Sequence, residues 1–444
     1  MSLFIRTALA AALTLLVVNT TNAQTPAPAA LPDPAATSVD ALGWMKGFPP
    51  PPDKLITFDN PTGGVFPRTR WSFSHVRETV PTANVWRGSG AASPLPTATP
   101  PVQIEAVTFK PLGNTGSEQT LNFAQMISGT YTDGILVMHR GKVVYEKYFG
   151  ALTPERPHIA MSLTKSFVGT LAAILADEGK LDPAAPVTRY IPELKDTAYG
   201  DATVRQVMDM TVGVHYSENY ADPKAEIWDY ARAGGMLVQG PGYAGPKSFY
   251  EFLRTLQKEG PHGEAFAYKT VNAEVLAWIL RRVSNLSLAD LLSEKIWRRI
   301  GAEQDAYFTV DRIGTESGGG GLNTTLRDLA RFAETMRNGG RANGQQVIPA
   351  AAITDITRGG DRAHFAKSGY ALLPGWSYRD MWWVTHNEHQ AYMARGIHGQ
   401  SIYIDPKAEM VIVRYAAHPI AANAGNDPLT LPAFHAVAKA LMRP

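Results

Sequence analysis

The chain reads Ser162-Leu-Thr-Lys-Ser-Phe-Val-Gly-Thr-Leu-Ala-Ala-Ile-Leu-Ala-Asp-Glu-Gly179 at one point, a serine followed by a lysine three residues later and then by a long apolar run. We expect a buried helix over residues 164–179, because the run is apolar on every face. Residues three apart lie on one face of a helix, with Cβ atoms about 5–6 Å apart. The Lys165 amine can therefore reach the Ser162 hydroxyl.

The chemistry of this serine and this lysine depends on where the helix places them. Burial disfavours a charged ammonium, so a buried Lys165 is available as a neutral base. Ser162 is expected at the helix N-terminus, where unpaired N–H groups carry partial positive charge and stabilise an oxyanion. Taken alone, the same residues also fit a helix-capping serine beside a lysine that extends to solvent.

Runs rich in β-branched and aromatic residues lie near both ends of the chain, with helical patterns between them. Residues 134–149 and residues 401–415 each hold two such runs around a turn, and each predicts a hairpin. The expected helices span residues 164–179, 203–210, 247–258, 270–284, 287–299, 325–337 and 431–442. This order predicts an α+β fold in which the two ends of the domain complete one antiparallel sheet, with a helical region inserted between them.

The first residues follow the order of a secretory signal peptide. One positive charge precedes an apolar run that ends near Val18, and small residues follow up to Ala23. We therefore expect a periplasmic or secreted protein of bacterial type, with no stable membrane insertion once the signal is removed. The expected organisation is a signal peptide over 1–23, a Pro/Ala-rich linker over 24–54, an irregular N-terminal wrap over 55–105 and the main domain over 106–444.

The composition excludes several classes of site and partner. The 444 residues include no cysteine, which excludes disulfides, a thiol nucleophile and a cysteine-bound metal. The 42 basic and 40 acidic residues include no basic block, so nucleic acid is not an expected partner. His386-Asn-Glu-His389 places two histidines beside a carboxylate but lacks the spacing of a metal site. No metal or other cofactor is expected.

Three further segments follow the serine and the lysine in a set order. They are Phe266-Ala-Tyr-Lys-Thr-Val-Asn272, Ser317-Gly-Gly-Gly-Gly-Leu-Asn-Thr-Thr325 and Ala394-Arg-Gly-Ile-His-Gly-Gln400. With them, the chain resembles the serine β-lactamase and penicillin-binding superfamily, in the class C-like branch of family VIII carboxylesterases and 6-aminohexanoate-dimer hydrolases. The last segment and Pro81-Thr-Ala-Asn-Val-Trp-Arg-Gly88 resemble the dimer hydrolases more than the lactamases. The resemblance implies a β-lactamase-like fold.

The resemblance also implies a tyrosine that shuttles a proton between the nucleophile and the leaving group. Tyr268 matches by its position before an apolar helix, although Thr270 departs from the Tyr-x-Asn pattern of class C lactamases. Ser217-Glu-Asn219 has the Ser-x-Asn form of penicillin-binding relatives and competes for the role. We favour Tyr268, because the sequence around it matches and the Ser217 region does not begin an apolar helix.

The strand that carries Lys-Thr-Gly in lactamases carries Ile397-His398-Gly399-Gln400 here, and we take these four residues as candidates for oxyanion or substrate binding. One N–H of the strand is expected to complete the oxyanion hole with the Ser162 N–H. Ile397 is the first choice for that donor and Gln400 the second. His398 either orients the leaving group or serves the structure alone. Tyr220, in a loop expected to overhang the cleft, is a candidate substrate contact.

Together these residues predict a serine hydrolase that acts on short linear amides or esters through an acyl-serine intermediate. Ser162 is the expected nucleophile, and Lys165 and Tyr268 divide the base and acid roles in a way that the sequence leaves open. One alternative is a β-lactamase or D-alanyl-D-alanine peptidase. The other is a penicillin-binding-type sensor that acylates without turnover.

Overall fold

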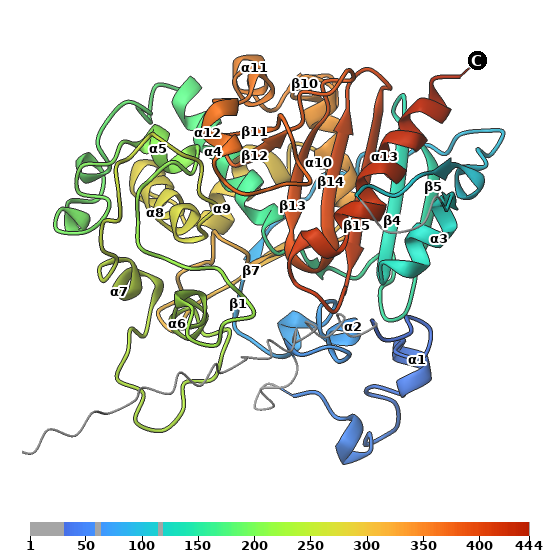
Figure 1. Ribbon diagram of the computed structural model, residues 1–444, viewed down its shortest axis with the longest axis horizontal. Helices are drawn as coiled ribbons and strands as arrows, with labels where there is room; N and C mark the ends of the chain where they lie inside the picture. The colour runs from blue at the N-terminus through green and yellow to red at the C-terminus, as the bar shows by residue number, and fades with distance from the viewer. Residues whose placement is uncertain (1–30, 58–63, 114–118, 444) are drawn as a thin grey trace, which may run out of the picture. The chain divides into compact units, whose positions relative to one another are not determined.

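Seven antiparallel strands form the main sheet, and they come from both ends of the domain (Figure 1). In sheet order they are β11 (Ser377–Arg379), β12 (Trp382–Val384), β13 (Tyr392–Gly396), β14 (Gln400–Asp405), β15 (Met410–Ala416), β4 (Thr132–His139) and β5 (Lys142–Tyr148). The last hairpin pairs directly with the first, with Met410 opposite His139 and Val413 opposite Leu136. Both expected hairpins are confirmed, and so is the single sheet completed by the two ends.

The computed structural model describes residues 31–57, 64–113 and 119–443. The expected signal peptide over 1–23 lies outside these described residues. The chain from Asp33 onward forms one unit. Within the described ranges, no helix combines the length and the apolar character needed to cross a bilayer.

A smaller antiparallel sheet brings the Ser162 segment next to the glycine-rich loop. Its strands, in order, are β1 (Thr82–Val85), β7 (Ala306–Thr309), β8 (Leu322–Thr324) and β6 (His158–Ile159). β6 ends just before Ser162, and β8 begins just after the glycines at 318–321. Strand β1 lies in the segment expected to be an irregular wrap, where four residues among glycines and prolines gave no strand signal.

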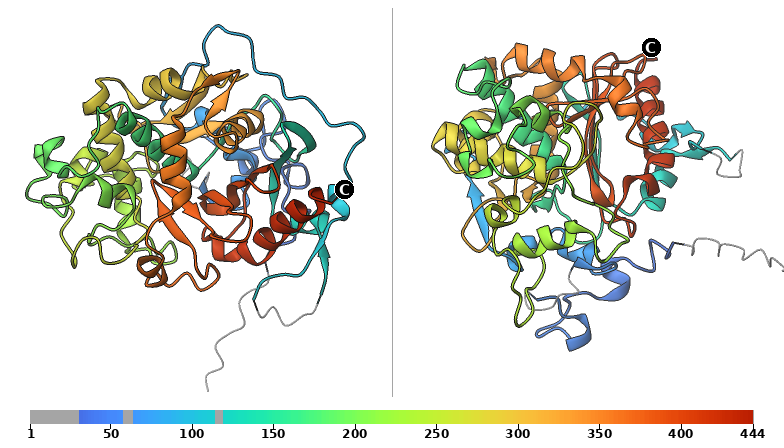
Figure 2. Two further views of the ribbon diagram at one scale, coloured as in Figure 1. Left: turned by 90° about the horizontal axis from the view of Figure 1, so that it is seen from above. Right: turned by 60° about the vertical axis from the view of Figure 1, so that its left-hand side comes forward.

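Helix α4 (Leu163–Asp177) packs against α8 (Val271–Ser284) and against strands of the main sheet (Figures 1 and 2). Its residues from Leu163 to Leu175 are all buried, which accounts for the apolar run. The backbone approaches the helix closely at Gly169, where a Cβ would lie 2.0 Å from the Asp380 carbonyl oxygen. Helix α10 (Leu326–Arg337) packs on β4, β14 and β15.

The expected helices are all present, with shifted ends. The other helices are α1 (Val39–Leu42), α2 (Thr69–Ser72), α3 (Phe123–Gly129), α5 (Val204–Met208), α6 (Glu226–Ala233), α7 (Phe249–Leu253), α9 (Leu288–Leu292), α11 (Ala350–Arg358), α12 (Arg362–Ala366) and α13 (Asp427–Leu441). Helix α13 begins before the expected residue 431, because Pro428 occupies its first turn, where proline lacks only an N–H that needs no helical partner. Helices α1, α2, α3, α6, α11 and α12 were not expected. The remaining strands are short pairs, β2 (Thr108–Phe109) with β3 (Leu121–Asn122) and β9 (Arg341–Ala342) with β10 (Gln345–Gln346).

The described part of the expected linker is folded rather than extended. Val39, Trp44 and Ile56 form a buried cluster with Trp71 of α2. Ser38 caps helix α1 by accepting a hydrogen bond from the Ala41 N–H at 3.2 Å. The apolar residues that make this cluster are few and widely spaced, so they left no periodic signal against the proline-rich background.

Candidate active site

Ser162 follows a sharp turn between β6 and α4. The Ala160 N–H donates to the Leu322 carbonyl at 2.8 Å and fixes the chain before the turn. Met161 has a φ of 50°, a left-handed conformation that costs a residue with a side chain about 1–3 kcal/mol and clusters at functional sites. The Ser162 hydroxyl makes no helix-capping hydrogen bond. The alternative of a capping serine therefore does not describe this residue.

Lys165 is almost fully buried, at 1% exposure. Its Nζ lies 2.8 Å from Ser162 Oγ and donates to the Gly319 carbonyl oxygen at 2.6 Å. Among the residues that the structure describes, no carboxylate forms an ion pair with this amine. Burial lowers the pKa of Lys165 to about 8, and the more distant carboxylates of Glu218 and Glu274 oppose the shift. An appreciable fraction of the amine is therefore neutral near neutral pH.

Tyr268 lies beside both of these residues. Its ring stacks on Trp383 with the centroids 5.4 Å apart, and Lys165 Nζ lies 5.1 Å from the ring centroid. The phenol is hydrogen-bonded to the Ser162 side chain. Burial, and then the Glu218 carboxylate, raise the pKa of Tyr268 well above its ordinary value, while the bond to Ser162 opposes the rise. The phenol therefore keeps its proton and is suited to donate it.

A buried carboxylate holds the glycine-rich loop in place. Glu274, on α8, accepts hydrogen bonds from the Gly318 and Gly319 N–H groups at 2.9 and 2.8 Å, and from the Tyr230 hydroxyl at 2.7 Å. A Cβ at Gly319 would lie 2.4 Å from the Thr270 side chain, so this approach requires glycine. The loop is a tightly packed turn beside Ser162. Glu274 itself was missed, although a single acid in an apolar helix is a signal that could have found it.

The Ser217-Glu-Asn219 segment brings its carboxylate, and not its serine, to the site. Ser217 Oγ accepts a hydrogen bond from the Asn219 N–H at 3.3 Å, within its own loop. Glu218 accepts a hydrogen bond from the Thr270 N–H and lines a pocket together with Ser162. Burial raises the pKa of this half-buried carboxyl group. Ser217 lines neither of the pockets that reach Ser162, and no sequence pattern singled out Glu218.

The turn after β13 brings Ile397 and His398 to the site, where both line a pocket with Ser162. His398 adopts a φ of 62°, and its Nδ1 lies 2.7 Å from the His418 carbonyl oxygen. Burial lowers the pKa of His398, so the ring is neutral and fixed by its backbone partner. The hydrogen bond to His418 gives His398 a structural role. Because His398 also lines the pocket at Ser162, a bound substrate can contact it.

Gly399 and Gln400 lie behind this turn. Gln400 Nε2 donates to the carbonyl oxygens of Ile397 and Ala416 at 3.1 and 2.7 Å, and its Oε1 accepts from the Ala416 N–H at 2.9 Å. The Gly399 carbonyl accepts a hydrogen bond from Arg414 at 2.7 Å. Neither residue lines the two pockets that reach the serine. Of the four candidates in this segment, the structure brings Ile397 and His398 to the site.

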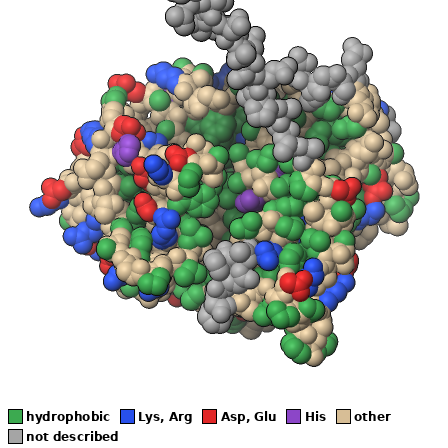
Figure 3. Space-filling model, turned by 60° about the horizontal axis from the view of Figure 1, so that its bottom comes forward, with side chains coloured by type: hydrophobic (Ala, Val, Ile, Leu, Met, Phe, Trp, Pro, Cys, Tyr) green, Lys and Arg blue, Asp and Glu red, His purple; other side chains and the backbone are tan. Residues whose placement is uncertain are grey.

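Two pockets meet at Ser162. The first, the apolar pocket, has a volume of about 380 Å³ and is lined by side chains that include Phe73, Val76, Ile227, Trp228 and Met236. Figure 3 shows hydrophobic side chains gathered around a hollow in the middle of one face. The second, the charged pocket, has a volume of about 360 Å³ and is lined by side chains that include Glu218, Tyr268, Arg395 and Asp427. Tyr220, the candidate substrate contact, lines both pockets.

The two histidines of the 386–389 segment face different partners. His386 Nε2 lies 2.7 Å from Ser377 Oγ. His389 Nδ1 lies 2.8 Å from the Asp405 carboxylate. The two histidines therefore do not converge on one ion, although Glu388 and His389 lie with His435 in a group whose ligand atoms are within 4.8 Å of one another.

Known proteins resemble this chain in both sequence and structure. A family model described as Beta-lactamase matches residues 122–430. The 6-aminohexanoate-dimer hydrolase of Paenarthrobacter ureafaciens is 36% identical over 354 residues, which cover 80% of this chain and 86% of that protein. A solved Bacillus anthracis structure, provisionally described as a 6-aminohexanoate-dimer hydrolase, has a TM-score of 0.79 at 32% identity and covers 88% of this chain and 98% of that one. A family VIII carboxylesterase has a TM-score of 0.51 at 18% identity, over 70% of this chain and 95% of its own, a likeness of fold alone.

Proposed function

The chain belongs to the beta-lactamase family of serine hydrolases, and we propose that it cleaves short linear amides or esters through an acyl intermediate on Ser162. The family match confirms the expected β-lactamase-like α+β fold. One observation carries the proposal: Ser162 Oγ lies 2.8 Å from a buried lysine whose pKa is lowered to about 8. A serine beside a largely desolvated amine is an activated nucleophile.

In the first half-reaction, Ser162 Oγ attacks the carbonyl carbon of the substrate. Its proton passes to the neutral Lys165 amine as the new C–O bond forms, and the carbonyl π electrons move onto oxygen. The backbone N–H groups of Ser162 and Ile397 are our candidates to stabilise this oxyanion. When the bond to the leaving group breaks, the Tyr268 phenol protonates the leaving atom and recovers a proton from Lys165. The products are an acyl-serine, a free amine or alcohol and a neutral lysine.

The second half-reaction repeats these steps with water. Lys165, neutral again, accepts the proton of a water molecule that attacks the acyl carbon. Collapse of the oxyanion breaks the bond to Ser162 Oγ, which recovers its proton, and the carboxylic acid leaves. Lys165 takes the base role in this scheme because the pKa of Tyr268 is raised well above its ordinary value, which leaves the phenol as the donor.

The proposal for the substrate rests on the relatives and on the strand at the site. The Paenarthrobacter protein is named for a dimer of 6-aminohexanoate, which is a linear amide. Where lactamases carry Lys-Thr-Gly on a strand, this chain has Ile397 and His398 in the turn between β13 and β14, so a lactam carboxylate meets no lysine there. A β-lactamase or D-alanyl-D-alanine peptidase, and a sensor that acylates without turnover, remain the rival functions.

We propose that the protein acts outside the cytoplasm, in a bacterial periplasm or as a secreted enzyme. The support is the signal-like order of its first 23 residues. Fractionation of expressing cells, with N-terminal sequencing of the purified protein, tests this directly. A mature chain that begins at Gln24 is the expected result, and a full-length cytoplasmic chain would contradict it.

Active-site labelling followed by a substrate panel tests the catalytic proposal. A fluorophosphonate should label Ser162 in the native enzyme and should not label Ser162→Ala, while the two proteins melt at the same temperature. The panel compares a p-nitrophenyl ester, the 6-aminohexanoate dimer, a cephalosporin and a D-Ala-D-Ala peptide. We expect kcat/KM for the better linear substrate to exceed that for the cephalosporin by at least about 100-fold, or ~2.7 kcal/mol. Faster lactam turnover would favour the lactamase, and an acylation burst without steady turnover would favour the sensor.

A further inference from the structure

The two pockets that meet at Ser162 differ in charge. Within the described lining of the apolar pocket no side chain is an aspartate, glutamate, lysine or arginine, and burial lowers the pKa of its one histidine, His398. The charged pocket holds Glu218 and an ion pair in which Arg395 Nη2 lies 2.6 Å from the Asp427 carboxylate. Among the described residues, a substrate that extends to both sides of the serine therefore meets uncharged side chains on one side and charged groups on the other.

The position of Tyr268 indicates which half of the substrate enters each pocket. The leaving atom has to lie beside the phenol that protonates it. Tyr268 lines the charged pocket and does not line the apolar one. The leaving group therefore departs through the charged pocket, and the acyl chain extends from Ser162 into the apolar pocket.

We propose that the acyl chain of the natural substrate is uncharged and apolar, and that any charge on the substrate is confined to its leaving group. This inference rests on the proposed function, because it takes the acyl-serine at Ser162 and proton donation by Tyr268 as given. An ammonium at the end of the acyl chain finds no carboxylate in the described lining of the apolar pocket and loses hydration there. A methyl group at the same place gains from its removal from water.

The charged pocket offers a partner for the opposite end of such a substrate. Arg395 Nη1 is buried and has no hydrogen-bond partner among the described residues, although Nη2 is engaged by Asp427. A carboxylate on an amino-acid leaving group can accept a hydrogen bond from this free N–H. The favoured substrate class is therefore an amide between an apolar carboxylic acid and an ω-amino acid.

Two amides that differ in one terminal group test the inference. N-hexanoyl-6-aminohexanoate and N-(6-aminohexanoyl)-6-aminohexanoate share the same leaving amine, and only the second carries an ammonium at the end of its acyl chain. We expect kcat/KM to be at least about tenfold higher for the hexanoyl amide. Equal or faster hydrolysis of the ammonium amide would overturn the inference.

A variant that places a carboxylate in the apolar pocket provides the matched test. Met236 lines this pocket and is 41% exposed, so a polar residue is tolerated there. Met236→Glu should shift the ratio of the two kcat/KM values by about tenfold toward the ammonium amide, whereas the neutral control Met236→Gln should not. A ratio that is the same in both variants would place the end of the acyl chain outside this pocket and would also overturn the inference.

The same measurements separate this inference from the proposed function. If Ser162 is labelled and both amides are hydrolysed, but the ammonium amide is preferred, the inference fails and the proposed function stands. If Ser162 is not labelled and neither amide is hydrolysed, the proposed function itself fails.

Discussion

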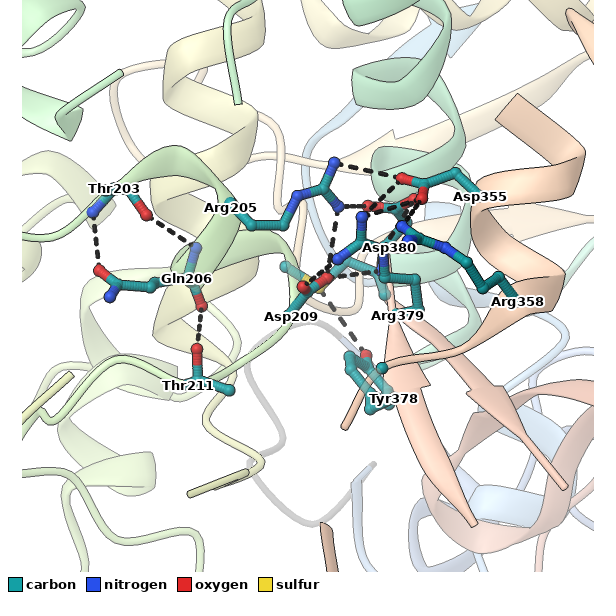
Figure 4. A network of polar contacts seen from close by, with 12 residues as sticks. Thr203, Arg205, Gln206, Asp209, Thr211, Asp355, Arg358, Tyr378, Arg379 and Asp380 are labelled. Atoms are coloured by element: carbon teal, nitrogen blue, oxygen red, sulfur yellow. Dashed lines mark hydrogen bonds and ion pairs between the residues drawn. The ribbon is translucent and has the colours of Figure 1, made fainter. Parts of the chain in front are cut away.

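Helix α4 meets buried ionisable groups at two places, and the two places are built in opposite ways. At its first turn, Lys165 is buried with Ser162 Oγ and a backbone carbonyl as its hydrogen-bonding partners. Beside its second turn, Ser166 Oγ donates to the Met381 carbonyl at 2.8 Å. The adjoining residue, Asp380, belongs to a network of arginines and aspartates (Figure 4).

The network gives its buried charges partners of opposite sign. Arg379 donates to Asp209 at 2.8 Å and to Asp355 at 2.9 Å. Arg205 donates to Asp355 at 3.2 Å and also to Asp380. Burial raises the pKa of Asp380 to about 7 even against the opposing effect of Arg205. These bonds tie α5, α11 and the β11–β12 turn together behind α4.

The comparison shows that the partner of a buried charged group, and not burial alone, decides whether the group serves the fold or the chemistry. Buried charges that are paired with opposite charges connect segments of the chain. Removing one partner leaves the other charge buried and unpaired. A buried lysine without a paired carboxylate has its pKa lowered toward the working pH and can act as a general base. Substitution of Lys165 should therefore lower the rate of catalysis with little effect on stability. Substitutions in the network should lower stability with little effect on the rate.

The largest expected effect is the loss of activity in Lys165→Met. Without its base, the enzyme should lose about 10³-fold or more in kcat/KM. Its melting temperature should be unchanged or higher, because an apolar chain replaces a buried amine. Lys180→Met, at an exposed lysine just beyond the same helix, is the control and should behave as the native enzyme. A Lys165→Met enzyme that retained a tenth of the native activity would remove the lysine from the mechanism.

Tyr268→Phe should have the next largest effect. The change removes only the hydroxyl and keeps the stacking on Trp383, so we expect a loss of about 10²–10⁴-fold in kcat with an unchanged melting temperature. The loss should be greater for an amide than for a p-nitrophenyl ester, whose leaving group needs no proton. Ser217→Ala is the matched control and should change kcat by less than about threefold. The opposite ranking of the two variants would assign the shuttle to the serine.

Substitutions in the network of arginines and aspartates should lower the free energy of unfolding and leave the rate nearly unchanged. Arg379→Gln removes a partner from both Asp209 and Asp355, and we expect a loss of ~2–3 kcal/mol in the free energy of unfolding, somewhat less than for a fully buried pair. Arg358→Gln, at a largely exposed arginine that contacts Asp355 alone, should cost less than ~1 kcal/mol. Denaturant unfolding measures both, and kcat per folded molecule should stay within about threefold. A large fall in kcat at full folding would mean that the network also tunes the site.

The sequence predicted the parts of the fold that rest on local pattern. The two hairpins and α4 follow from strand and helix periods, and the pairing of the two ends follows from their order along the chain. Strand β1 and the cluster around Trp44 could not be predicted, because their few apolar residues are buried by segments distant in sequence. The network in Figure 4 was equally hidden, since Arg205 and Asp380 are brought together only by the tertiary fold.

The candidate site likewise has a part that local spacing predicted and a part that depends on the tertiary fold. Ser162 and Lys165 could be paired from their spacing, because a helix fixes the distance between them. The turn between β13 and β14 could not be predicted, and it brings Ile397 and not Gln400 to the pockets. Glu218 was overlooked because its loop was judged by its serine. The roles of these residues remain predictions until the variants are measured.

Glu218→Gln should have the smallest effect on the rate. It tests how far a nearby carboxylate sets the pKa of Lys165. The Glu218 carboxylate raises the pKa of Lys165 against the effect of burial. Its removal should therefore move the midpoint of the pH–rate profile to lower pH, by an amount smaller than the shift that burial causes. Stopped-flow acylation at several pH values measures it. A midpoint that rises would show that this carboxylate acts on another group.

The pH dependence of acylation tests most directly whether a neutral Lys165 is the base for Ser162. Single-turnover acylation by a p-nitrophenyl ester is followed from about pH 6 to pH 10, with the rate in Ser162→Ala subtracted. Because burial places the pKa of Lys165 at about 8, the rate should rise about tenfold per pH unit below that value and level off above it. A rate that stays constant from pH 6 to pH 10, or falls as the pH rises through 8, would contradict the account.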